Sequence, residues 1–159
     1  MTVRGFRASI ARPAAALWVE LTEWHRQIYA APEIGGDDPG AAFDEHLERI
    51  GPENLWVAEE GGRVVGLAGL IRGGEDLELE PVVVSESCRG RGIGRALAGA
   101  VLAAAGDAPV IVRPVGRNAE AIRFFHSVGF DVLSRVELLR HAWDRWQPAE
   151  RIADRVFRA

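Results

Sequence analysis

The sequence predicts one mixed α/β domain. Apolar residues alternate with a period of two in some stretches and recur at helical spacing in others, and the two patterns follow one another along the chain. The chain has 159 residues, of which 48% are hydrophobic and 26% are charged, and this suffices for one ordinary hydrophobic core. The expected order of elements is β-α-α-β-β-β-α-β-α-β.

The first half of the chain is expected to hold one strand, two helices and a hairpin. Pro13 suits the first turn of a helix, and apolar residues follow it on one helical face, namely Leu17, Leu21, Trp24 and Ile28. Gly51-Pro52 stops the second helix, and Gly61-Gly62 joins two strand-like runs. The elements are expected at residues 3–9 (strand), from 13 (helix), 32–40 (loop), 41–50 (helix) and 54–71 (hairpin).

The second half continues with strands and helices in alternation. A strand over 76–84 contains Pro81, which has no N–H to donate, so a bulge or a break in pairing is expected near it. Gly129 is suited to end the last clear helix. The other elements are expected at 93–106 (helix), 109–114 (strand), 118–129 (helix) and, weakly, 131–141 (strand). The tail over 142–159 fits a last helix or a last strand equally well.

Composition excludes several classes of function. All 19 basic residues are arginine, so the chain has neither the lysine of a P-loop nor a lysine for Schiff-base chemistry. The net charge of −4 argues against general nucleic-acid binding, which depends on cationic groups. No apolar run approaches the ~20 residues of a membrane span, the start lacks a secretory signal, and the single cysteine, Cys88, cannot form an internal disulfide. We therefore expect a cytoplasmic protein without a nucleic-acid, membrane or metal partner.

The stretch SCRGRGIGRAL, residues 87–97, follows the apolar run PVVV and opens a helix. The first-turn amides of a helix lack intrahelical partners, and the helix dipole makes that end electropositive. Glycines let a phosphate approach the backbone, and Arg89, Arg91 and Arg95 add positive charge. The pattern therefore favours a phosphate-binding turn. The alternative is an ordinary turn with glycines for conformation and arginines facing water.

The spacing of these glycines does not fit the dinucleotide fingerprint Gly-x-Gly-x-x-Gly, because Gly90, Gly92 and Gly94 alternate and an arginine follows them. The segment instead resembles the pyrophosphate loop of the GNAT superfamily of N-acyltransferases, with the signature (Arg/Gln)-x-x-Gly-x-(Gly/Ala). A second signature of that family is Asn-x-x-Ala-x-x-(Phe/Leu)-Tyr-x-x-x-Gly-Phe. The residues in its register are Asn118, Ala121, Phe124, Phe125, Gly129 and Phe130. The resemblance covers about residues 3–140.

The resemblance implies a GNAT-type, mostly antiparallel central sheet flanked by helices, in which the strand before the glycine stretch and the next strand are parallel and splay apart. It implies a GNAT domain over 1–141 and leaves 142–159 as a tail. It also implies acetyl-CoA (coenzyme A) as the donor, with the pantetheine arm on the strand backbone and the pyrophosphate on the loop amides. The implied cofactor-binding residues are Val82, Val83, Val84, Arg89, Gly90, Arg91, Gly92, Ile93, Gly94, Arg95, Asn118 and Phe125.

Acetyl transfer to an amine requires the amine to be neutral, and Glu78 and Glu80 are the candidates for the catalytic base. They lie two residues apart, so both side chains point to one face of a regular strand. An ordinary glutamate with a pKa of about 4.3 is a poor base for an ammonium group with a pKa of about 10.4. A raised pKa, a water relay or capture of neutral amine is therefore required. Alternatively, the carboxylates only bind a cationic substrate or form a solvated strand face.

The departure from the family pattern is Phe125, which stands where the family has a tyrosine that acts as general acid toward the CoA sulfur. A phenylalanine has no proton to give, although a thiol with a pKa of about 8.5 is a tolerable leaving group without help. The candidate substitutes are a water, His126 and Tyr29, the one tyrosine. His126 is better explained as a helix-surface histidine, and Cys88 as a packing residue rather than a nucleophile.

The acceptor is expected to be a primary amine of a small molecule or a peptide. An acidic rim would attract such a cation, and tryptophans offer aromatic walls, although the spacing of Trp24 favours core packing. The rim candidates are Glu75, Asp76, Glu78, Glu80, Asp37 and Asp38, and the tryptophans are Trp18, Trp24 and Trp56. Polyamines, amino sugars, amino acids and peptide amines all stay open. The tail, with Trp143, Trp146, Val156 and Phe157, is expected to cover an apolar patch or to join a homodimer.

The sequence therefore predicts an acetyl-CoA-dependent N-acetyltransferase that acts by direct transfer in a ternary complex. The alternative from a different class is an acyl-CoA-binding sensor or regulatory domain with weak or no catalysis. Phe125 favours this alternative, whereas Glu78 and Glu80 oppose it. A purely structural or interaction domain would leave both cofactor signatures without a use.

Overall fold

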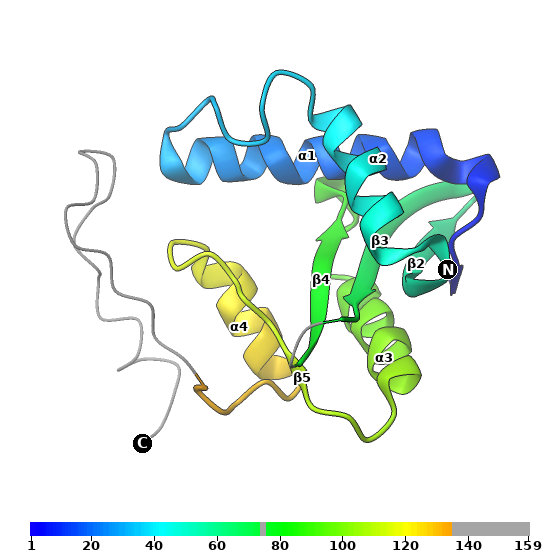
Figure 1. Cartoon of the computed structure of the whole chain (residues 1–159), viewed down its shortest axis with the longest axis vertical. Coiled ribbons are helices and arrows are strands. Elements are labelled where there is room, and N and C mark those ends of the chain that lie inside the picture. Colours follow the sequence, from blue (N-terminus) through cyan, green and yellow to red (C-terminus); the bar gives the residue numbers. More distant parts are fainter. Residues whose placement is uncertain (74–75, 135–159) are drawn as a thin grey trace.

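A five-stranded sheet runs through the computed structural model, which describes residues 1–73 and 76–134 (Figure 1). The strands lie in the order β1-β2-β3-β4-β5. Neighbours are antiparallel except β4 and β5, which are parallel. The bounds are β1 (Thr2–Gly5), β2 (Leu55–Glu60), β3 (Arg63–Ile71), β4 (Leu77–Val84) and β5 (Val110–Ile111). The predicted mixed α/β class, mostly antiparallel with one parallel pair, is confirmed.

Helices flank the sheet on both faces. The described α-helices are α1 (Ala11–Tyr29), α2 (Pro39–Ile50), α3 (Ile93–Ala105) and α4 (Ala119–Ser127), and the short 3₁₀ turns are η1 (Ala8–Ile10), η2 (Pro52–Asn54) and η3 (Glu86–Cys88). All four helices and the hairpin were predicted, with ends that differ by a few residues. No helix within the described ranges is long and apolar enough to cross a membrane.

Two predicted strands are shorter than expected, and a third forms no regular element in the part that the structure describes. β1 ends at Gly5, because the chain then turns into η1, and β5 has two residues in place of the expected 109–114. Of the strand expected over 131–141, residues 131–134 form no regular element. The rest of it, the domain boundary at 141 and the tail 142–159 lie outside the described residues.

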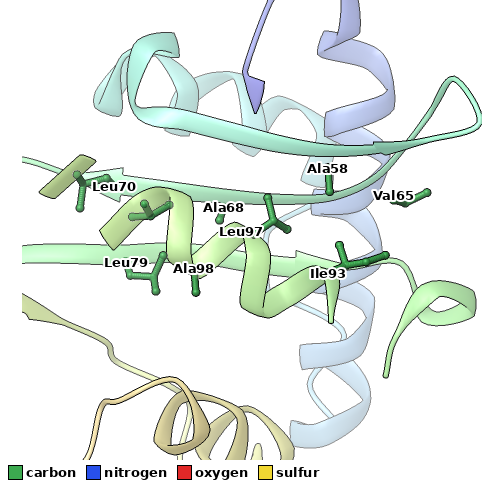
Figure 2. Packing of buried hydrophobic residues seen from close by; sticks show 9 residues of the cluster. Ala58, Val65, Ala68, Leu70, Leu79, Ile93, Leu97 and Ala98 are labelled. Carbon is green, nitrogen blue, oxygen red and sulfur yellow. The ribbon is translucent and has the colours of Figure 1, made fainter. Parts of the chain in front are cut away.

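The core has two parts, one on each face of the sheet. α3 contributes Ile93, Leu97, Ala98 and Val101 to one part, where they pack on side chains from β2, β3 and β4 (Figure 2). α1 and α2 cover the other face with residues that include Leu17 and Phe43. Apolar side chains that alternate along each strand therefore reach both cores, which is why the strands read as nearly continuous apolar runs.

The expected core face of α1 is correct only in its first half. Leu17 is buried and Leu21 packs against the same cluster. Trp24 was expected in the core, but it belongs to neither described cluster and is half-buried, with the Arg89 guanidinium 5.5 Å from its ring centre. The reason is that the second half of α1 extends past the sheet, over the turn that follows β4.

Pro81 lies at a bulge, as predicted. Ala68 of β3 pairs with Val82, and Leu70 pairs with Leu79, so two residues of β4 oppose one of β3. The one opposing residue is Gly69, where a Cβ would lie 2.5 Å from the Glu80 carbonyl oxygen. A glycine at this position is therefore required for the bulge to fit against β3.

The bulge also reverses the faces of β4. Before it, Leu79 packs into the α3 core; after it, Val82 and Val84 do so, while Val83 joins the α1 and α2 core. A regular strand would put Leu79 and Val83 on the same face. The extra residue is what turns Val82 and Val84, rather than Val83, toward the α3 core.

Candidate active site

β4 and β5 are paired only at their first residues. Leu77 pairs with Val110 and Glu78 with Ile111, where β5 ends. Beyond Glu78, the described part of the chain offers β4 no partner from β5. This is the splay that the family resemblance implies, and it leaves one backbone edge of the second half of β4 open.

The glycines of the loop over residues 89–94, here called the glycine loop, have two different roles. Gly90 and Gly92 have φ angles of +73° and +80°, which strain any residue with a side chain, and a Cβ on either would meet nothing within 4 Å. The backbone there is open to a ligand. At Gly94 a Cβ would lie 3.1 Å from the Phe124 ring, so this glycine lets α3 pack closely on α4.

The first turn of α3 has the features of an anion site. Gly92 is the N-cap, and none of the described side chains caps this end. Uncapped first-turn amides and the positive end of the helix dipole both attract an anion. Together with the open backbone at Gly90, they fit the pyrophosphate of CoA.

The three arginines near this loop are engaged within the protein. Their partners are the Val84 carbonyl oxygen for Arg89 (3.1 Å), the Glu60 carboxylate for Arg91 (2.8 Å) and the Ser127 carbonyl oxygen for Arg95 (3.0 Å). Their charges surround the loop, but their hydrogen bonds hold neighbouring elements in place. The backbone amides are therefore the groups best suited to meet an anion directly.

α1 holds the turn that precedes the glycine loop. A Glu20 Oε1 atom accepts a hydrogen bond from the Glu86 N–H at 2.6 Å and lies 3.9 Å from Arg89 Nη2. Trp24, one turn further along α1, carries the Arg89 guanidinium on its ring. Sequence reasoning missed Glu20, because nothing in the spacing of α1 connects it to a segment this far along the chain.

Glu78 and Glu80 lie on the face of the sheet that α1 and α2 cover. Glu78 pairs with Ile71, whose side chain packs against the α1 and α2 core. Glu78 is 9% exposed and forms an ion pair with Arg113, which comes from the segment after β5. Arg113 was missed by the sequence analysis, although its place two residues past the strand that pairs with Glu78 was a usable signal.

Glu80 differs from Glu78 in both exposure and pKa. The residue is exposed at the surface, yet neighbouring protein atoms desolvate its carboxylate and raise its pKa, and the negative charge of Glu78 raises it further. Arg49 and Arg113 lower the pKa of Glu80, but their effects are smaller. A carboxylate with a raised pKa is a stronger base, so Glu80 meets the first of the three alternatives named above for obtaining a neutral amine.

The end of α2 brings a second arginine to this face. Arg49 Nη2 lies 3.0 Å from His46 Nδ1, and an arginine can only donate, so Nδ1 accepts and the ring proton is on Nε2. His46 is 4% exposed, and its ring centre lies 4.7 Å from that of Trp18. Burial and the Arg49 charge lower the pKa of His46 to about 4. We call Glu78, Glu80, Arg113 and Arg49 the charged face.

Two carboxylates of the expected acidic rim are used for other purposes. Asp38 caps α2, because its Oδ1 accepts from the N–H groups of Gly40 (2.9 Å) and Ala41 (3.2 Å). Glu75 lies outside the described residues, and Arg113 neutralises Glu78. No group of three His, Cys, Asp or Glu side chains in the described ranges could hold a metal ion.

The expected aromatic walls are also part of the packing. Trp18 lies between Phe43 and His46, at ring-centre distances of 6.0 and 4.7 Å. Trp56 packs against the α3 core. Cys88 packs against the same core, as expected for a packing residue rather than a nucleophile.

The end of α4 explains how Phe125 is held. Phe130 N–H donates to the Phe125 carbonyl oxygen at 3.1 Å, and Gly129 N–H, at a φ of +104°, donates to that of His126 at 3.2 Å. This is a Schellman motif, and the contact between the Phe125 and Phe130 rings, 5.8 Å apart, completes it. The predicted glycine stop at Gly129 is confirmed, and Phe125 serves as its apolar partner.

The remaining predicted site residues lie near the start of α4. Asn118 caps this helix, with its Oδ1 accepting from the Ala121 N–H at 3.0 Å. Tyr29 ends α1 and is buried, with the Arg117 guanidinium 5.3 Å from its ring centre. Burial raises the pKa of Tyr29, while the Arg117 charge and backbone lower it by less. α1 therefore reaches the loop before Asn118, and His126 is exposed on α4.

Comparison with known proteins matches the chain to one family. The model of the acetyltransferase (GNAT) family matches residues 18–130. The chain is 37% identical over 102 residues to the N-alpha-acetyltransferase RimI of Mycobacterium tuberculosis, covering 60% of this chain and 63% of that protein. It is 38% identical over 100 residues to the mycothiol acetyltransferase of Clavibacter michiganensis, covering 60% and 32%. The chain spans 28% to 63% of the length of the curated relatives it matches.

Solved structures agree on the fold. The aminoglycoside acetyltransferase AAC(6')-Iy, in complex with a bisubstrate analogue made of CoA and an acetylated neamine, superimposes with a TM-score of 0.63 at 18% identity. The match covers 89% of this chain and 98% of that one.

Proposed function

The chain belongs to the GNAT family of acetyltransferases, whose members use acetyl-CoA, and we propose that it transfers the acetyl group from acetyl-CoA to a primary amine of a small molecule or a peptide. The observation that carries the proposal is that two features lie next to each other along β4, the strand that splays away from β5. An anion site with open backbone follows β4, and a carboxylate with a raised pKa stands on β4 itself.

The cofactor would be held mainly by backbone groups. The amides at the start of α3 and the open backbone at Gly90 and Gly92 suit its pyrophosphate. The free edge of Val82–Val84 suits the amides of the pantetheine arm, which would add to β4 as a further strand does. Bound acetyl-CoA supplies the acetyl group as a thioester, which is the electrophile of the reaction.

Glu80 is the better candidate for the residue that accepts the amine proton. Glu78 is committed to Arg113, whereas Glu80 is exposed and has a raised pKa. In this role Glu78 is a positioning residue, because its charge raises the pKa of Glu80 and its ion pair fixes Arg113. Proton removal by a positioned group typically contributes about 10²–10⁴-fold to a rate.

Phe125 gives the second candidate function its support. Its ring packs between Phe124 and Phe130, with ring-centre distances of 5.2 and 5.8 Å, and so carries out a packing role at the end of α4. A protein that has kept the cofactor loop without the tyrosine acid fits an acyl-CoA-binding sensor. The proposed enzyme would instead release the thiolate to water unaided.

Two measurements on the wild-type protein separate these functions. Acetyl-CoA at 100 times its Kd should stabilise the fold by about 2.7 kcal/mol, read as a rise in Tm of a few degrees. A thiol-release assay with a panel of amines should then give amine-dependent CoA. Stabilisation without release would favour the sensor, and Phe125→Tyr should in that case restore turnover. Absence of any stabilisation would overturn the cofactor assignment.

A further inference from the structure

The charged face contains two arginines, whereas a site for a purely cationic acceptor needs no positive charge. Glu78 and Arg113 form one ion pair and neutralise each other. Glu80 and Arg49 are the second carboxylate and the second guanidinium of the face, and each is exposed. The face is therefore a pair of opposite charges beside an ion pair, not an acidic rim.

The backbone fixes Arg49 near Glu80. Ile50, the residue after Arg49, ends α2 over the bulge of β4. A Cβ placed at Gly69 would lie 3.2 Å from Ile50 Cδ1 and 2.5 Å from the Glu80 carbonyl oxygen, so α2 and the bulge meet at this point. The charge of Arg49 also lowers the pKa of Glu80, as expected for a neighbour.

Arg49 is held in position without being neutralised. Its partner is the Nδ1 atom of His46, which is buried and carries no charge near neutral pH. Within the described residues Arg49 makes no ion pair, unlike Arg89, Arg91 and Arg113. A guanidinium that is oriented by a neutral acceptor keeps its full charge and its remaining N–H groups for another anion.

From this arrangement we propose that the acceptor is an amine with a carboxylate close to it, and that Arg49 is the specificity-determining residue that binds this carboxylate while the amine faces Glu80. The inference rests on the proposed acetyl transfer. A polyamine would bring a second ammonium group against Arg49, which opposes its binding. Amino acids and acidic peptides share the required chemistry.

The test uses pairs of acceptors that differ only in one charge. Acetylation would be followed with Ala-Asp-amide against Ala-Asn-amide and with free alanine against alaninamide, and spermidine would represent polycations. The wild-type protein should prefer the member of each pair that carries the carboxylate by about tenfold in kcat/KM, as a charge-assisted hydrogen bond provides. The peptide pair and the amino-acid pair distinguish the two sources of the same chemistry.

The variant that tests the role of Arg49 is Arg49→Gln, because glutamine keeps a donor for His46 but has no charge. It should bring the preference close to one and leave acetyl-CoA stabilisation unchanged. Arg63→Gln, on an exposed arginine at the start of β3, is the matched control and should retain the preference.

A preference for the carboxylate member that survives in Arg49→Gln would overturn the inference. So would faster acetylation of spermidine, or acetylation of no panel member by a protein that acetyl-CoA stabilises. If acetyl-CoA fails to stabilise the wild-type protein, the proposed function falls, and the acceptor inference falls with it.

Discussion

In the glycine loop the groups suited to a ligand are backbone amides, whereas on the charged face they are side chains from β4, from α2 and from the segment after β5. The loop depends on a few neighbouring residues, two of them glycines with positive φ angles. The charged face depends on contacts such as that between Glu78 and Arg113, 35 residues apart. The first is a local property of the chain, and the second exists only after the sheet has formed.

This difference determines which part of a ligand each of the two regions can recognise. Backbone amides carry no information about the rest of the ligand, so a loop of this kind suits a pyrophosphate in any member of a large family. Side-chain charges from three elements vary independently of the loop. The acceptor can therefore change while the cofactor site stays the same.

The largest expected effect comes from Glu80→Gln. If Glu80 accepts the amine proton, kcat/KM should fall by about 10²–10⁴-fold. The wild-type kcat/KM should rise with pH through the raised pKa of Glu80, and the variant should lack this limb. Glu78→Gln removes the charge that raises this pKa, so it should move the limb to lower pH. Equal pH profiles for wild type and Glu80→Gln would contradict the assignment.

The next-largest effect is on stability and comes from Gly69, the glycine opposite the bulge of β4. Gly69→Ala puts a Cβ 2.5 Å from the Glu80 carbonyl oxygen, and β3 and the bulge must move apart. We expect a loss of about 3 kcal/mol in the free energy of unfolding, measured by urea titration. Gly99→Ala is the matched control, since a Cβ there meets nothing within 4 Å on an exposed side of α3. It should stabilise the protein by about 0.5–1 kcal/mol.

A pH-dependent effect follows from His46. Its pKa is about 4 in the folded state against 6.5 when unfolded, so its contribution to stability is complete above pH 6.5 and is lost as the pH falls toward 4. The loss at pH 4 should approach about 3 kcal/mol, because each unit of pKa shift corresponds to about 1.36 kcal/mol. His46→Gln should flatten this part of the stability profile. Burial also lowers the pKa of His25, so His25→Asn measures how much that histidine contributes to the same pH dependence of stability. An unchanged stability profile in His46→Gln would refute the prediction.

The smallest effect tests the tie between α1 and the glycine loop. Glu20→Ala removes the acceptor of the Glu86 N–H and the partner of Arg89. Because the turn leads into the pyrophosphate site, we expect acetyl-CoA affinity to fall about tenfold, as for the loss of a charge-assisted hydrogen bond. Binding of acetyl-pantetheine, which has no pyrophosphate, should not change. A comparable loss for both ligands would indicate general damage to the fold instead.

Most of the fold could be predicted from the sequence, because its signals are local. Pro81 predicted a bulge, Gly129 predicted the end of α4, and the alternation after the hairpin predicted β4. Trp24 was assigned wrongly to the core, because helical spacing gives the face of a residue but not how far the sheet extends beneath it. The short β5 was also overestimated, since an apolar run does not reveal where its partner strand diverges.

The site could be predicted only in part, for the same physical reason. Both cofactor signatures gave the glycine loop and the cap of α4 directly. Neither the Arg113 partner of Glu78 nor the Arg49 contact with His46 was found, because each depends on the way distant elements meet. An acidic rim was expected from a count of carboxylates, but pairing and capping decide which of them keep their charge for a ligand.

The bulge in β4 limits how this chain can vary over evolutionary time. Two residues of β4 fit opposite Gly69 only because this glycine has no side chain, and deleting one of them would restore a regular strand that keeps Val82 and Val84 on the α3 face with Leu79. A larger residue at position 69 is accommodated only if the opposite strand loses its extra residue. We therefore expect a larger residue at position 69 and the loss of one residue from the β4 bulge to occur together, so homologues should have both changes or neither.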